Sequence, residues 1–316
     1  MVLNQSKRTR LTPKSSKLSP ALLDDFLGTL AGFYADYGRH DMLWRQPSLE
    51  AAGTAAPAGL SGGFDPYKIL VSELMLQQTQ VARVTPKYAE FLEALPSVQA
   101  LAAAPLSEVL TLWSGLGYNR RAKFLWQAAQ RVVGEYGGEF PRTVAELQKL
   151  PGVGPNTAGA IMAYAYNQPV SYLETNIRTV IIHHFFQDQT GIADKDIRQV
   201  VDQIVARIGE VPANGELAAG LSPREFYWAM MDYGTHLKQI VGNLNRDSKS
   251  YSKQSKFHGS RRQLRGQVIR LLAQRPYTQD DVVNLLADDR TAGVVDDLVA
   301  EGLVGRGGRI LKLGVY

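Results

Sequence analysis

The sequence contains no cysteine among its 316 residues. Disulfide bonds, thiolate nucleophiles, cysteine-ligated zinc and iron–sulfur clusters all require cysteine side chains, so each of them is excluded. Histidine is scarce as well, and the five histidines show no spacing with carboxylates that is typical of a metal site. The sequence therefore predicts a protein that holds neither a metal ion nor a cofactor.

Long hydrophobic runs are also missing. No apolar stretch approaches the roughly 18 residues of a membrane-spanning helix, and the basic N-terminus is not followed by the apolar core of a signal peptide. With 45% hydrophobic residues, the chain is long enough to form two packed domains. We therefore expect a soluble, cytoplasmic protein, and nothing in the sequence suggests more than a monomer.

Acidic residues are nearly absent from two segments, although the net charge of the whole chain is only +5. Residues 1–18 contain five Lys or Arg and no acid, and residues 238–275 contain ten against a single acid, Asp247. Positive charge that is concentrated in separate segments is better explained by binding to phosphate groups than by a need for solubility. The charge pattern thus favours a nucleic-acid partner.

Convincing strand patterns are missing from most of the chain. Residues 1–18 are polar and aperiodic and are interpreted as a basic flexible tail. Residues 19–241 consist of short helical segments separated by Pro or Gly and predict an all-α domain. Within it, Asp65 and Pro66 are typical of a helix start, and the helix is predicted to continue to about Tyr88. Residues 242–259 are predicted to form a basic linker.

The last segment, residues 260–316, has a different pattern. It predicts three short helices and then a β-hairpin that turns at Gly307-Gly308. Their ranges are 266–273, 278–287, 291–301 and 303–313. Three helices followed by a hairpin indicate a small winged-helix-like module, which either places a helix in the major groove of DNA or contacts another protein.

The motif LPGVG, residues 150–154, joins two predicted helices. Its glycines permit positive φ and remove Cβ atoms from the path of a ligand. The N–H groups at the start of the second helix have no partner within the helix, so they can bind a phosphate oxygen without reading base sequence. This interpretation predicts DNA contacts by Gly152, Val153, Gly154 and Thr157, whereas the motif alone leaves open an ordinary turn between helices.

Four segments together form a specific pattern. They are VSELMLQQTQV (71–81), LWSGLGYNRRAKFL (112–125), FPRTVAELQKLPGVGPNTAGAI (140–161) and WAMMDYG (228–234). On these segments the sequence resembles the helix-hairpin-helix DNA glycosylase superfamily, and within it the adenine DNA glycosylases of the MutY type more closely than endonuclease III. The resemblance implies the all-α helix-hairpin-helix glycosylase fold and a base excision repair enzyme that flips a base out of double-stranded DNA and hydrolyses its N-glycosidic bond.

The resemblance also implies two catalytic carboxyl groups. The family's acid falls on Glu73, where apolar neighbours are expected to raise its pKa so that it can protonate the leaving adenine. The family's second carboxylate, an Asp that stabilises positive charge on the sugar, falls on Glu174. Glu is one methylene longer than Asp, so its carboxylate is placed differently. Three outcomes stay open: Glu174 works as the catalytic carboxylate, it alters the specificity, or the protein binds DNA without catalysis.

Three further positions follow from the resemblance. Endonuclease III-like enzymes have a Lys nucleophile just after LPGVG, whereas this chain has Asn156. The resemblance therefore implies a monofunctional enzyme with no abasic-site lyase activity, in which water is the final nucleophile. Gln78 and Tyr118 fall on the family's wedge residues, which fill the gap that the extracted base leaves; helix packing is the alternative role for Tyr118.

Two family features are not evident. Most adenine glycosylases hold a [4Fe–4S] cluster with four cysteines after the segment written here as WAMMDYGTHL, so the resemblance is to a clusterless member. The family's C-terminal domain for 8-oxoguanine is absent from residues 260–316, which are too short for it. The resemblance implies adenine opposite 8-oxoguanine or guanine as the expected substrate. A thymine or uracil mismatch glycosylase and a non-catalytic DNA-binding relative are the alternatives.

Overall fold

The computed structural model describes residues 17–47, 63–210, 218–253 and 256–314. Most of the predicted tail and residues 254–255 of the predicted linker therefore lie outside the described residues. Contacts divide the chain into two compact units, which we describe separately. Unit 1 comprises the described parts of residues 1–65 and 158–253, and unit 2 comprises those of residues 66–157 and 254–316.

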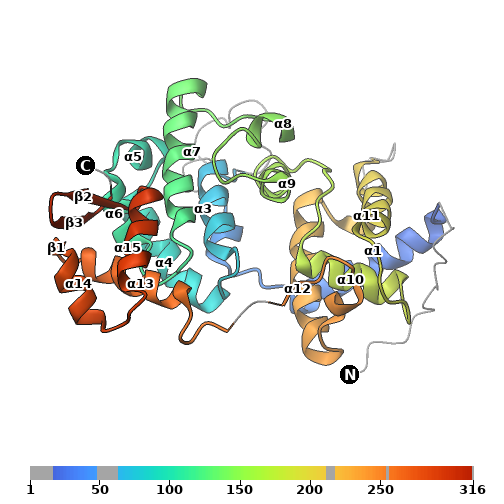
Figure 1. The fold of residues 1–316 in the computed structure, drawn as a ribbon. Coiled ribbons are helices and arrows are strands. Elements are labelled where there is room, and N and C mark those ends of the chain that lie inside the picture. Colours follow the sequence, from blue (N-terminus) through green and yellow to red (C-terminus); the bar gives the residue numbers. More distant parts are fainter. Residues whose placement is uncertain (1–16, 48–62, 211–217, 254–255, 315–316) are drawn as a thin grey trace. The chain divides into compact units, whose positions relative to one another are not determined.

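Both units are built mainly from helices, so the prediction of a helical fold is confirmed (Figure 1). In unit 1 these are α1 (Pro20–Tyr37), the 3-10 helix η1 (Leu43–Arg45), α10 (Thr175–Phe185), α11 (Asp194–Gly209), η2 (Ala218–Gly220), α12 (Pro223–Ile240) and η3 (Leu244–Asp247). Unit 2 contains α3 (Pro66–Leu76), α4 (Val81–Ala94), α5 (Val98–Ala103), α6 (Leu106–Leu112), α7 (Arg120–Tyr136), α8 (Val144–Leu147) and the C-terminal elements. The boundary between the units falls within α9 (Pro155–Tyr164).

Unit 1 is organised around the packing of α10 on α12, with α1 and α11 against the same pair. Helix α12 begins sharply because the Ser222 and Glu225 side chains form a capping box and Pro223 occupies the first turn. The α10–α12 contact is close at Gly234, where a Cβ would lie 2.5 Å from the main-chain oxygen of Asn176. Glycine at this position thus lets α12 approach the start of α10, where Glu174 lies.

Unit 2 has its own apolar core beneath α3, α4, α6 and α7. Leu74 and Met75 of α3 are almost completely buried, as are Trp113 and Leu125. Helix α7 ends at Gly137, which adopts the left-handed conformation with φ of 63°. This core fixes the positions of the two loops that precede α4 and α7.

One predicted helix is wrong. The sequence predicts a continuous helix from Pro66 to about Tyr88, whereas α3 ends at Leu76 and α4 starts at Val81. Gln78 lies in the break with φ of 55°. The segment QQTQ contains no Gly or Pro, so propensity gives no signal for a break that tertiary hydrogen bonds stabilise.

The C-terminal module has the predicted three helices and hairpin, but the hairpin turns at Gly308 and Arg309, one residue later than predicted, because Gly307 still pairs with Ile310. Helices α13 (Arg261–Leu272), α14 (Gln279–Leu286) and α15 (Thr291–Ala300) are followed by β2 (Val304–Gly307) and β3 (Ile310–Leu313), and a short β1 (Tyr277–Thr278) completes the antiparallel sheet in the order β1-β3-β2. Register pairs Arg306 with Leu311 and Tyr277 with the same Leu311. The module packs within unit 2, where β3 contacts α6.

The two units cut across the predicted segments of the chain. The predicted domain 19–241 is shared between both units, and part of the predicted linker packs in unit 1, where Asn245 donates a 2.8 Å hydrogen bond to the Thr179 hydroxyl. The predicted domain boundaries stay a prediction, because clusters of contacts do not establish which segments fold independently. No helix in the described ranges has the length and apolar character needed to cross a membrane.

Candidate active site and DNA-contact residues

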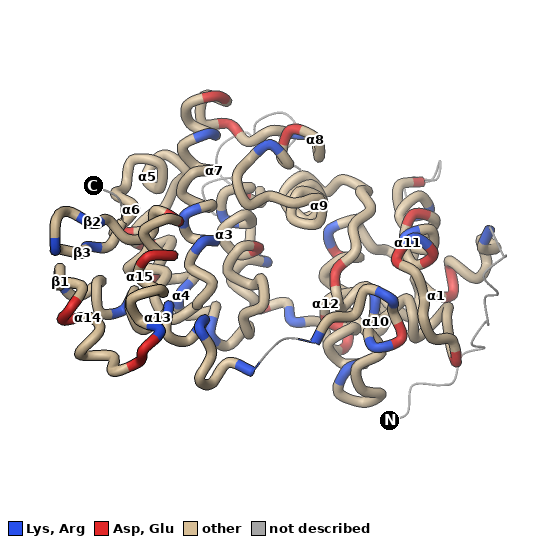
Figure 2. The backbone as a smooth tube through the Cα atoms, in the orientation of Figure 1, with Lys and Arg blue, Asp and Glu red and all other residues tan. Residues whose placement is uncertain are grey.

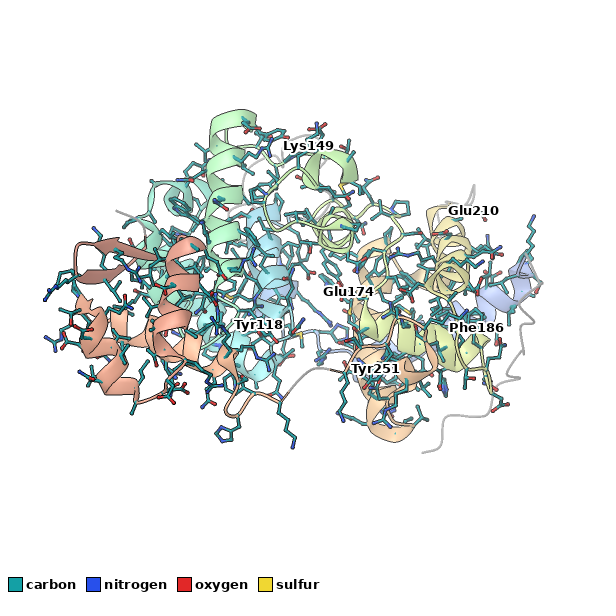
Figure 3. All side chains as sticks on the ribbon, viewed as in Figure 1. Tyr118, Lys149, Glu174, Phe186, Glu210 and Tyr251 are labelled. Atoms are coloured by element: carbon teal, nitrogen blue, oxygen red, sulfur yellow. The ribbon has the colours of Figure 1, made fainter. Side chains whose placement is uncertain are left out.

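The predicted site residues fall in both units. Glu174 lies in unit 1, and Figure 3 labels it at the start of α10. The others lie in unit 2: Glu73, Gln78, Tyr118, Gly152, Val153, Gly154, Asn156 and Thr157. Each group is therefore described within its own unit.

Glu174 is the N-cap residue of α10, with extended backbone angles and no hydrogen bond from its side chain to the usual capping positions. The side chain is half-buried. Burial raises the pKa of the Glu174 carboxyl above its ordinary value of 4.5, while Arg178, the Thr175 N–H and Lys238 act in the opposite direction. Glu174 is thus a desolvated carboxyl group with two cations nearby. Desolvation strengthens its electrostatic interaction with any charge that develops beside it.

Asn176, two residues after Glu174, has its amide group held on both sides. Its Oδ1 accepts a 2.5 Å hydrogen bond from the Lys238 ammonium, and its Nδ2 donates a 3.4 Å hydrogen bond to the Thr235 hydroxyl. Burial and Arg178 lower the pKa of Lys238, and Glu174 partly offsets them. The start of α10 therefore carries a connected polar group rather than one isolated carboxylate.

A buried ion pair in unit 1 joins Asp232 of the WAMMDYG segment to Arg45. Asp232 is 4% exposed, and both its carboxylate oxygens accept hydrogen bonds from Arg45, at 2.7 and 2.9 Å. Arg39 adds a 2.8 Å bond from its main-chain N–H. Although burial raises the pKa of Asp232, these arginine contacts outweigh it and hold the pKa below its ordinary value. Asp232 is thus a structural residue that fixes α12.

Glu73 lies on α3 in unit 2, and its side chain is half-buried. Leu70, Leu74 and Met75 are each no more than 1% exposed, so the helix surface beside Glu73 is set into an apolar core. These are the apolar neighbours that the sequence predicts around a carboxyl donor. The role of Glu73 as an acid stays a prediction.

The two predicted wedge residues lie on separate loops of unit 2 that one arginine joins. Both have left-handed backbones, with φ of 55° at Gln78 and 48° at Tyr118. Buried Arg121 donates to the carbonyl oxygen of Leu74 in the last turn of α3 and to that of Gln77 on the loop after it, each at 2.6 Å. The same guanidinium donates at 2.9 Å to the Gly117 carbonyl oxygen on the other loop.

Arg121 replaces the helical hydrogen bonds that are lost where α3 ends, because carbonyl groups of a last helical turn need donors from elsewhere. Burial lowers the pKa of Arg121 to about 10, with Tyr118 acting against the shift. Sequence reasoning missed this residue. The signal that points to it is a basic side chain in the first turn of α7, where the helix dipole is unfavourable for a cation and another partner is needed.

The LPGVG turn lies between α8 and α9 as predicted, but its residues differ in their roles. Gly152 has φ of 77°, and a Cβ there would lie 2.7 Å from Cβ of Phe124. Gly154 has no positive φ, and a Cβ there would have no atom within 4 Å. The expectation of positive φ therefore holds for Gly152 and is wrong for Gly154, whose missing side chain instead leaves open space.

The remaining hairpin residues are partly or fully buried. Val153 is 5% exposed, so only its main chain is suited to a phosphate contact. Thr157 is 7% exposed, and its hydroxyl accepts a 3.4 Å hydrogen bond from Gln77. Asn156 is half-buried in the first turn of α9. The DNA contacts of these residues stay predictions.

Across the described ranges, no group of three or more His, Asp or Glu side chains is placed to hold a metal ion. The chain also has no cysteine, so its residues do not fit an iron–sulfur cluster. After α12, the chain instead continues through η3, which Asn245 fastens to α10 by its bond to Thr179.

Comparison with known proteins matches residues 71–207 to the HhH-GPD superfamily of base excision DNA repair proteins. An adenine DNA glycosylase of Buchnera aphidicola is 36% identical over 160 residues, which cover 51% of this chain and 41% of the relative. The human adenine DNA glycosylase is 41% identical over 157 residues, covering 49% of this chain and 27% of the relative. The chain thus spans less than half the length of these relatives.

Among solved structures, a thermostable thymine-DNA glycosylase matches with a TM-score of 0.47 and 22% identity, covering 68% of this chain and 86% of that one. Residues 71–207 thus match the model of the HhH-GPD superfamily of base excision DNA repair proteins, and about half of the chain is similar to adenine DNA glycosylases.

Proposed function

We propose that the protein is a monofunctional DNA N-glycosylase that removes adenine opposite 8-oxoguanine or guanine in double-stranded DNA. The observation that carries this proposal is the desolvated Glu174 carboxyl at the start of α10, on a segment that matches the HhH-GPD model. Similarity to relatives named adenine DNA glycosylase supports adenine as the base. The protein is proposed to act as a monomer and without a metal or cluster.

In the proposed reaction, the bond between C1′ of deoxyribose and adenine breaks, and its electron pair goes to the base. Glu73 donates a proton to a ring nitrogen of adenine, so the base leaves neutral. Ionised Glu174 stabilises the positive charge that develops on the sugar. Water then adds at C1′ and loses a proton, which yields free adenine and an abasic site.

Asn156 supports the monofunctional part of the proposal. A lyase reaction through a Schiff base requires an amine that attacks C1′, and an amide nitrogen is not nucleophilic enough for this step. The wedge residues Gln78 and Tyr118 are proposed to enter the duplex as the base leaves it. Their loops are already fixed by Arg121, so little ordering is needed on binding.

The test is single-turnover base release from duplexes with A opposite 8-oxoguanine, A opposite G, T opposite G and U opposite G. Each reaction is analysed with and without alkali for the wild type, Glu73→Gln and Glu174→Gln. Glu210→Gln is the matched control, because Glu210 is an exposed side chain of unit 1 paired with Arg207 (Figure 3).

We expect adenine release with strand breaks only after alkali, a loss of at least about 100-fold in both active-site variants, and no change in the control. Release of thymine or uracil without adenine contradicts the adenine assignment. Strand breaks without alkali contradict the monofunctional assignment, and binding without release of any base contradicts the enzymatic function.

A further inference from the structure

A pocket of about 340 Å³ lies within unit 2, and its walls come from three separate segments of the chain. The first wall contains Gln78, Thr79, Gln80 and Arg83. The second is the loop from Ser114 to Asn119, which includes Tyr118. The third comes from the C-terminal module and includes Phe257 and Arg262. The two proposed wedge residues therefore share a pocket with a module that the matched segment, residues 71–207, does not contain.

Arg262 of α13 contacts Tyr118 in two ways. Its Nη1 donates a hydrogen bond to the Tyr118 hydroxyl, and its guanidinium carbon lies 5.1 Å from the centre of the Tyr118 ring. The same guanidinium carbon also lies 5.5 Å from the centre of the Phe257 ring. Arginine is suited to such a role because its planar guanidinium stacks on aromatic rings and donates hydrogen bonds in fixed directions.

The C-terminal module is fastened to the rest of unit 2 at further points. Lys123 of α7 donates a 2.5 Å hydrogen bond to the main-chain oxygen of Glu301, whose carboxylate pairs with Arg265 at 2.5 Å. At the end of β3, a Cβ on Gly314 would lie only 3.1 Å from the main-chain nitrogen of Ser107. Arg262 therefore contacts Tyr118 from a helix that is packed against the rest of unit 2, and not from a module joined to it only by a linker.

The pocket is positively charged. Arg83, Arg262 and Arg270 contribute to its lining, and none of the lining residues is acidic. Helix α13 contains four arginines and no acid. Lys and Arg positions are drawn in blue in Figure 2. Arg261 and Arg265 pair with acids of α15 or the residue after it, whereas the arginines that line the pocket share it with no acidic residue, and positive charge of this kind attracts a polyanion.

We propose that α13 of the C-terminal module forms part of the surface that holds duplex DNA at the wedge, and that Arg262 is the positioning residue for Tyr118. The proposal rests on the proposed function. Arg262 holds the Tyr118 ring in the orientation in which it enters the base stack, so the module acts at the site of base extraction. A module that only docks another protein or reads distant major-groove bases does not require this contact.

The test measures base extraction with a duplex that carries 2-aminopurine at the target position opposite guanine, since the fluorescence of this base rises when it leaves the stack. The variants are Arg262→Ala, Arg262→Lys, Tyr118→Phe and the Arg262→Ala/Tyr118→Phe double variant. Arg261→Ala is the matched control, because Arg261 lies on the same helix but pairs with Asp297 at 2.6 Å. Thermal unfolding of each variant checks that the fold is kept.

We expect the extraction equilibrium to fall about 10-fold in Arg262→Ala, to fall less in Arg262→Lys, and to stay near wild type in Arg261→Ala. The extraction equilibrium of the double variant should fall no further than that of the more strongly affected single variant, because both substitutions break the same interaction. Independent effects that multiply in the double variant overturn the proposal. Equal losses in Arg261→Ala and Arg262→Ala also overturn it, because charge alone then explains the effect.

The fluorescence signal does not depend on glycosidic cleavage. Extraction that depends on Arg262 without release of adenine from its own substrate contradicts the proposed function and supports this inference. Adenine release and base extraction that are both unchanged in Arg262→Ala contradict this inference and leave the proposed function standing.

Discussion

Lys238 of α12 donates a 2.5 Å hydrogen bond from its ammonium group to the side-chain oxygen of Asn176, next to the turn that carries Glu174. The two residues are 62 positions apart in the sequence. Together with Arg178, Lys238 lowers the pKa of Glu174 against the effect of burial. The ionised state of this carboxylate therefore depends on side chains that the matching motifs do not include.

Replacing Lys238 should change the pH dependence of base release. Activity that needs ionised Glu174 is lost as the pH falls through the pKa of this carboxyl, which burial already raises above 4.5. Lys238→Met removes a positive charge that lowers this pKa, so the pKa should rise further. The acid limb of the single-turnover rate profile should move to higher pH. An unchanged limb, or the same shift in Lys195→Met on the exposed face of α11, would contradict this coupling.

Replacing Arg121 should destabilise unit 2 strongly. Arg121→Ala removes the Arg121 donor from the buried carbonyl groups of Leu74 and Met75, and each buried group left unsatisfied costs about 1–3 kcal/mol. The loss in free energy of unfolding, measured with denaturant, should therefore exceed about 3 kcal/mol. Arg131→Ala on the same helix removes two exposed interactions, a pair with Glu135 and a hydrogen bond to the Lys149 carbonyl oxygen, and should change the free energy of unfolding much less. Equal effects of the two substitutions would refute this role of Arg121.

The two glycines of the LPGVG turn should respond differently to alanine. Gly152→Ala forces a positive φ on a residue with a Cβ and brings that Cβ against Phe124, so the melting temperature should fall. Gly154→Ala meets no atom within 4 Å and should fold normally. If DNA approaches this open side of the turn, as proposed, Gly154→Ala should weaken binding to duplex DNA in fluorescence anisotropy. Unchanged affinity would place the DNA elsewhere.

Acid should destabilise unit 1 through Asp232. Its pKa is held below the ordinary value of 3.8 in the folded protein, so its contribution is present above that value and is lost as the pH falls through the folded pKa. Asp232→Asn leaves buried Arg45 without its counter-charge and should cost about 3–5 kcal/mol at neutral pH. The difference from wild type should shrink below about pH 4. A difference that stays constant down to pH 2 would show that the ion pair is not its cause.

The helical character of residues 19–241 is predicted from the sequence, because apolar periodicity acts locally. The C-terminal helices and hairpin were predicted for the same reason. The break around Gln78 was not, since it depends on hydrogen bonds from Arg121, which lies 44 residues away from the Gln77 carbonyl that it binds. Contacts of Lys238 and Arg262 were missed likewise, because residue spacing carries no information on contacts between distant helices.

Arg121 fastens the wedge loops through main-chain oxygens of residues such as Gln77 and Gly117 and not through their side chains. A substitution at Gln78 or Tyr118 therefore leaves the anchoring bonds in place. The loops can exchange the side chains that they present while keeping their shape. New base preferences can therefore arise at these two positions, in evolution or in a mutant library, with little loss of stability. No stabilising change elsewhere is needed first.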